Sequence, residues 1–77
     1  MNDAKLTVTT EEGQKITIDV IDIFELEGYD KEFIIYSIGN DIYSSILIED
    51  ETTFTLKNIE DSNDMKIIKK HIEELVS

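Results

Sequence analysis

Alternating apolar and polar positions predict β-strands over the first two thirds of the chain. In residues 5–10, Leu6 and Val8 alternate with threonines, which is the period-2 pattern of a half-buried strand. Residues 11–14 follow, and Gly13 can supply the positive φ that a tight hairpin turn needs. These positions therefore predict a β-hairpin whose second strand starts near Lys15.

The second predicted strand, residues 15–26, has an irregular pattern. Its apolar residues with even numbers are interrupted only by Asp22, whereas Ile21 and Ile23 have the opposite parity. Either the strand contains a bulge near residues 20–22, or both of its faces are partly covered. An inward carboxylate would need a partner or a proton, so we favour a bulge that turns Asp22 to solvent.

Three more strands are predicted, over residues 32–38, 42–48 and 53–57. Residues 39–41 form a three-residue loop between the first two of these strands, which places Ile38 opposite Ile42. That register gathers one apolar set on one face of the sheet: Ile34, Tyr36, Ile38, Ile42, Ile46 and Ile48. The other face receives Phe33, Ile35, Tyr43 and Leu47.

The apolar spacing changes after Ile59 and becomes that of a helix. Apolar residues recur three or four positions apart, at Met65, Ile68, Ile72 and Leu75. Asp61 or Ser62 is the expected N-cap, and Asp64 in the first turn suits the helix dipole. Strands followed by a helix favour one α+β domain, residues 1–77. We expect a small antiparallel β-meander of four to five strands with one C-terminal amphipathic helix packed on one face.

Composition and charge exclude several kinds of site and partner. The chain has no cysteine, which excludes disulfides and thiolate chemistry, and its single histidine argues against a zinc site. The net charge is −11, from 18 acidic residues and 7 lysines, and its field repels both nucleic acid and anionic membranes. No signal peptide and no apolar run of about 20 residues is recognisable. We therefore expect a cytoplasmic protein that binds neither nucleic acid nor membrane.

Few residues suggest chemistry. His71 borders the apolar stripe of the helix, where its ring can lie across the sheet, and a structural role is favoured. Residues 61–64 resemble the start of a calcium loop but lack its glycine and its terminal glutamate, so a helix cap is favoured. Residues 49–51 are interpreted as a solvated acidic turn. We predict no catalytic residue, no metal site and no cofactor, and hence a protein that is not an enzyme.

The sequence contains more apolar side chains than one helix can cover. Six of them fall on the second face of the predicted sheet or near its edge: Ile21, Ile23, Phe33, Ile35, Tyr43 and Leu47. Exposed together they would exceed what a monomer normally presents, so we expect a like subunit or a protein partner to cover them. The alternative is that bulges turn several of them inward.

These observations favour a non-enzymatic protein–protein interaction or adaptor domain that is also able to self-associate. Apolar side chains would anchor the partner, and acidic residues at the rim would tune specificity and association rate. One alternative is an acidic modulator that mimics nucleic acid on a basic protein surface. A small enzyme is the other alternative, and the sequence offers no residues in its support.

A family resemblance is carried by the acidic turn after Ile48 and by two stretches of the sequence, LTVTTEEGQKITIDVIDIFELEGYDKEFIIY and IEDSNDMKIIKKHIEELVS. In the order of these features the chain resembles the YrzB-like proteins, an uncharacterised family of small acidic proteins from low-GC Gram-positive bacteria. The resemblance implies a cytoplasmic protein. It implies no activity, cofactor or catalytic residue, because the family is a domain of unknown function.

Overall fold

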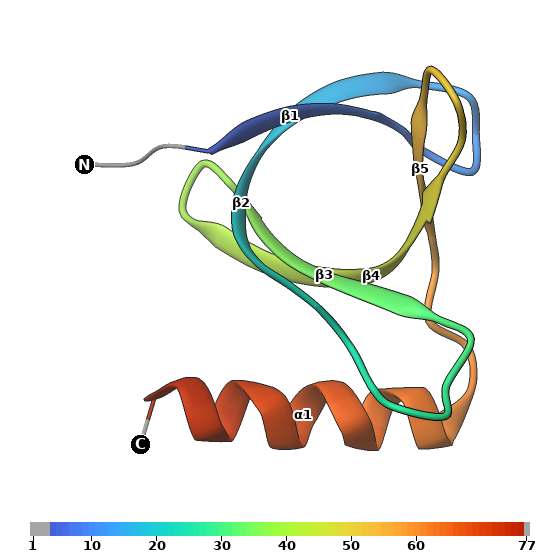
Figure 1. Ribbon diagram of the computed structural model, residues 1–77. Helices are drawn as coiled ribbons and strands as arrows, with labels where there is room; N and C mark the ends of the chain where they lie inside the picture. Colours follow the sequence, from blue (N-terminus) through green and yellow to red (C-terminus); the bar gives the residue numbers. More distant parts are fainter. Residues whose placement is uncertain (1–3, 77) are drawn as a thin grey trace.

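The computed structural model describes residues 4–76 and contains five strands followed by one helix (Figure 1). The elements are β1 (Lys5–Thr9), β2 (Lys15–Glu25), β3 (Glu32–Ile38), β4 (Asp41–Glu49), β5 (Phe54–Lys57) and α1 (Ser62–Val76). The α+β content and the C-terminal position of the helix are as predicted. The helix of residues 62–76 is not long and apolar enough to cross a membrane, and no other helix occurs in the described part of the chain.

The sheet closes into a small barrel, so the prediction of an open meander is wrong. Each strand pairs antiparallel with the next, and β1 returns to pair parallel with β5, where Thr9 lies opposite Thr55. Figure 1 shows the strands as a ring with α1 beneath it. Closure has a simple cause, because a five-stranded sheet left open would expose one of its two apolar faces to water.

The inside of the barrel is the main hydrophobic core. Its buried members come from all five strands: Val8, Ile18, Ile34, Tyr36, Leu47 and Leu56. The hydroxyl of Tyr36 lies 3.1 Å from Oγ of Ser45, so the two polar groups inside the barrel satisfy each other. Closure thus buries one apolar face of the sheet against itself, without a helix or a partner.

The predicted bulge in the second strand is present. Val20 pairs with Tyr36 and Asp22 pairs with Ile35, which leaves Ile21 as the extra residue. Before the bulge the even-numbered side chains of β2 point into the barrel, and after it they point outward. The bulge therefore directs Asp22 toward α1 and not to solvent, contrary to our interpretation of the sequence.

The hairpin between β3 and β4 has a two-residue loop and not the predicted three. Ile38 pairs with Asp41, and Gly39 has φ +62°, the conformation that a type II′ turn requires at its first central residue. The register is therefore one residue away from the predicted one, which exchanges the faces of β4. Tyr43 lies on the inner face of the strand, and Ile42 lies on its outer face.

Helix α1 lies on the outer face of the barrel and covers a second core. Buried Phe33, Ile46 and Ile68 form its centre, and the partly buried residues around them are Phe24, Tyr29, Ile59, Ile67 and Ile72. Asp61 is the N-cap, because its Oδ1 accepts a hydrogen bond of 2.8 Å from the backbone N–H of Asn63. The predicted packing of the helix on one face of the sheet is confirmed.

Candidate functional site

The first turn of α1 is fixed to the barrel by a buried carboxylate. Asp64 is only 1% exposed and accepts hydrogen bonds from Nζ of Lys31 at 2.6 Å and from the hydroxyl of Tyr29 at 3.0 Å. The bond from Lys31, helped by the bond from Tyr29, outweighs desolvation and lowers the pKa of Asp64 below its ordinary value. The loop between β2 and β3 thus holds the start of the helix.

The middle of α1 is fixed to β2 through the only histidine. The ring of His71 stacks on that of Phe24, with centroids 3.6 Å apart and an angle of 12° between the planes. Its Nε2 lies 2.6 Å from Oδ2 of Asp22, which is hydrogen-bond distance. The prediction that this imidazole lies across the sheet is confirmed, and both of the contacts attach one side of α1 to β2.

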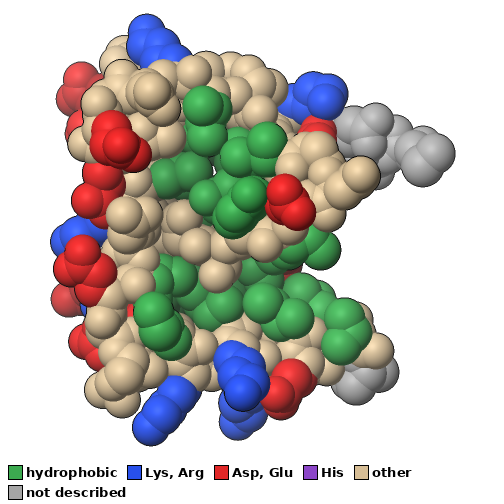
Figure 2. All heavy atoms as spheres, turned by 180° about the vertical axis from the view of Figure 1, so that it is seen from behind, with side chains coloured by type: hydrophobic (Ala, Val, Ile, Leu, Met, Phe, Trp, Pro, Cys, Tyr) green, Lys and Arg blue, Asp and Glu red, His purple; other side chains and the backbone are tan. Residues whose placement is uncertain are grey.

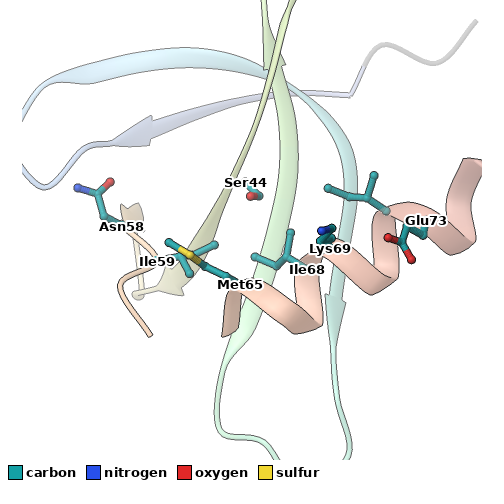
Figure 3. A pocket seen from close by; sticks show the side chains of 8 residues that line it. Ser44, Asn58, Ile59, Met65, Ile68, Lys69 and Glu73 are labelled. Atoms are coloured by element: carbon teal, nitrogen blue, oxygen red, sulfur yellow. The ribbon is translucent and has the colours of Figure 1, made fainter. Parts of the chain in front are cut away.

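The other side of α1 faces an open groove of about 660 Å³ between the helix and β4. Its lining residues come from β4, from the connection between β5 and α1, and from the helix: Ser44, Asn58, Ile59, Met65, Ile68, Lys69, Ile72 and Glu73. Figure 3 shows Ile68 rising from α1 toward Ser44, and Met65 reaching toward Ile59 at one end. The floor and walls are mainly apolar, and the charged side chains belong to the helix.

A second hollow of about 410 Å³ extends the groove toward the end of α1. Ile72 lines both, and the second hollow also contains Ile21, Asp22, Ile35, Ile42, Leu75 and Val76. Ile42, Met65 and Leu75 are 66%, 54% and 51% exposed, which is high for large apolar side chains. Figure 2 shows apolar side chains on the barrel and on the facing side of α1, with an opening between them.

The six residues predicted to form an interface divide into two groups. Ile21, Ile23 and Tyr43 are exposed, whereas Phe33, Ile35 and Leu47 are buried within the chain. Leu47 is inside the barrel and Phe33 is beneath the helix, so each belongs to a core. Of the six, only Ile21 and the buried Ile35 line the extended groove.

Four exposed apolar groove residues were missed by the sequence reasoning: Ile42, Met65, Leu75 and Val76. Met65 and Leu75 were placed on the apolar stripe of the helix, but within that stripe only Ile68 is fully buried and Ile72 is partly buried. The signal for Ile42 is present in the sequence, because a Gly39-Asn40 two-residue turn sets the register that places it outward.

A pair of carboxyl groups lies at another place on the barrel. The pKa of Glu32 is raised to about 7. The largest cause is a side-chain hydrogen bond with Glu49, followed by partial burial and by repulsion from Glu49 and Glu25. The two residues share a hollow with Lys31 and Lys57, away from the groove. In residues 4–76, no three His, Cys, Asp or Glu side chains come together in a way that could hold a metal ion.

No family model, no curated protein and no solved structure matches this chain. The resemblance to the YrzB-like proteins therefore stays a prediction.

Proposed function

We propose that the protein is a non-enzymatic binding domain that holds an apolar segment of a partner protein in the groove beside α1. The observation that carries the proposal is the pair of apolar walls, of which Ile42 and Met65 are more than half exposed. Burying such side chains under a partner contributes a favourable free energy of about 25 cal/mol per Å² of apolar surface removed from water. A groove that already lies between two fixed elements also loses little conformational entropy when it is filled.

The charge of the chain selects a basic partner. Glu73 lines the groove and Asp41 lies exposed beside it, against a single lining cation, Lys69. Asp22 lines the second hollow but is already engaged by His71. The whole chain has a net charge of −11, so a second copy would approach against long-range repulsion, whereas a Lys- or Arg-rich segment would be attracted. We therefore favour a basic partner over self-association as the occupant.

His71 supports a binding role over a catalytic one. Its ring is stacked on Phe24 and its Nε2 is engaged by Asp22, so the imidazole serves to attach the helix. A general base must also face a pocket that holds the substrate. His71 lines neither hollow of the groove, and only its partner Asp22 borders the second one.

Mimicry of nucleic acid is the second candidate function. Figure 2 shows Asp and Glu side chains gathered along the edge of the molecule away from the opening, and the net charge of −11 agrees with such a surface. The two functions differ in salt dependence. Capture through acidic side chains weakens strongly as salt screens the charges, whereas capture through the apolar groove tolerates salt.

The test is a selection of random peptides displayed on phage against the immobilised wild-type chain. Selected peptides are then measured against Met65→Glu, in the groove, and Leu26→Glu, another exposed apolar position, on the other side of α1. We expect Met65→Glu to weaken binding at least about tenfold, because a carboxylate would be buried unpaired, and Leu26→Glu to leave it unchanged. The proposal would be refuted if the selection enriched no peptides, or if the selected peptides bound Met65→Glu as tightly as wild type.

A further inference from the structure

The edge of β4 beside the groove has no neighbouring strand over half of its length. β4 begins at Asp41, yet β5 pairs only with its second half, from Ile46 to Glu49. In the part of the chain that the structure describes, no strand pairs with residues 41–45 on this side. After Lys57 the chain leaves the sheet toward α1, and the groove opens between this connection and Ser44 (Figure 3).

The pairing register shows which backbone groups this edge presents. Ile38 and Asp41 close a two-residue hairpin and so form a hydrogen-bonded pair, and such pairs alternate along an antiparallel ladder. Asp41, Tyr43 and Ser45 therefore direct their backbone groups toward β3. The N–H and C=O groups of Ile42 and Ser44 point the other way, in line with those of Ile46 and Ile48, which lie opposite β5.

The open edge and the apolar groove are parts of one surface. Ile42 and Ser44 have outward side chains on the face that α1 covers, and they line the two connected hollows. A chain laid against this edge would place every second side chain between β4 and the helix. The intervening side chains would lie on the side of the exposed Tyr43.

We propose that an extended segment of a basic partner protein adds to β4 as a further strand, with its alternate apolar side chains in the groove beside α1. The proposal rests on the proposed function and specifies how the segment is held. Only an extended backbone can pair with the N–H and C=O groups of Ile42 and Ser44 while it inserts apolar side chains at every second position. A helical guest satisfies its own backbone groups and would leave those of β4 unpaired.

The segment comes from a partner of opposite charge and not from a second copy. Pairing two β4 edges would bring together two chains that each have a net charge of −11, with an exposed Asp41 on each edge. Lysine or arginine next to the apolar positions of a guest would instead face Asp41 and Glu73. Exposed edges of this kind are otherwise blunted by lysine or proline, and residues 41–45 contain neither.

The experiment measures amide hydrogen exchange by NMR with the groove-dependent peptides selected above. In the free protein we expect fast exchange at Ile42 and Ser44 and slow exchange at Tyr43 and Ser45, which bond to β3. Saturating peptide should slow exchange at Ile42 and Ser44 at least about tenfold and leave Tyr43 and Ser45 unchanged. Unchanged exchange at Ile42 and Ser44 in a tight complex would overturn strand addition and leave the proposed function standing.

Backbone methylation of the peptide supplies the matched control. N-methylation of a guest residue that pairs with Ile42 or Ser44 should weaken binding at least about tenfold, and methylation of the intervening residue should have no effect. Equal effects at both positions contradict strand addition. Slow exchange at Ile42 and Ser44 that appears without peptide as the protein concentration rises would identify a second copy as the occupant, contrary to the proposal.

Discussion

Replacing Glu32 by glutamine should stabilise the protein at neutral and alkaline pH and have little effect in mild acid. In the folded protein the pKa of Glu32 is raised from 4.5 to about 7, first by the hydrogen bond with Glu49 and then by burial and repulsion. Between pH 4.5 and about 7, Glu32 holds a proton in the folded state that it has released in the unfolded chain. The contribution of Glu32 to the free energy of unfolding is therefore fully present below about pH 4.5 and is lost as the pH rises through about 7.

The size of the effect follows from the pKa. One pKa unit corresponds to 1.36 kcal/mol, so a pKa that rises from 4.5 to about 7 sets a ceiling of about 3.4 kcal/mol. Glu32 is only partly buried, and solvent screens its repulsion from Glu49 and Glu25. We therefore expect Glu32→Gln to gain about 1 kcal/mol of unfolding free energy above about pH 7.5.

Urea unfolding followed by circular dichroism at about pH 5 and about pH 8 measures this gain. Glu49→Gln should give a similar gain, and the double variant should add little, because either change removes the same repulsion. The exposed Glu27→Gln, which is not among the groups that raise the pKa of Glu32, is the control and should show no such pH dependence. An equal gain for Glu32→Gln at both pH values would refute the reasoning, because the effect would then not come from ionisation.

Two further predictions concern the attachment of α1. Asp64→Asn should lower the urea midpoint at about pH 7, and the difference from wild type should shrink as the pH falls below about 3.8, where the lowered pKa of Asp64 no longer favours the folded state. A difference that persists undiminished at about pH 2.5 would contradict this. Ile68→Ala should cost about 3 kcal/mol of unfolding free energy, because Ile68 is buried under the helix, whereas exposed Met65→Ala should cost less than about 0.5 kcal/mol. Equal losses in the two variants would show that α1 does not pack through Ile68.

The elements of this fold could be predicted from the sequence because their signals are local. Alternation of apolar residues marks the strands, the change of spacing after Ile59 marks the helix, and the opposite parities around Asp22 mark the bulge. Closure of the barrel depends on the meeting of Thr9 and Thr55, which are 46 residues apart (55 − 9). No local pattern specifies such a contact, so an open meander was the natural expectation.

The candidate site was harder to predict because it depends on one residue of register. Choosing three loop residues after Ile38 in place of two exchanged the faces of β4, which turned Tyr43 outward and Ile42 inward relative to the structure. Because the sheet closes, Leu47 is buried inside the barrel, and Phe33 is buried between the sheet and the helix. Which apolar side chains are exposed depends on the pairing of β3 with β4, which the composition does not specify.

The groove follows from the bulge through a chain of contacts. The extra residue Ile21 turns Asp22 and Phe24 outward, and both then contact His71. These contacts hold α1 against β2, so the helix covers the outer face of the sheet unevenly and leaves Ile42 at the far side 66% exposed. Without the bulge, Asp22 would face the apolar interior of the barrel, where an unpaired carboxylate is costly, and His71 would lose its partner on the sheet. The irregularity that interrupts the pattern of β2 thus sets the position of the helix, and the position of the helix leaves both the apolar groove and the open edge of β4 accessible.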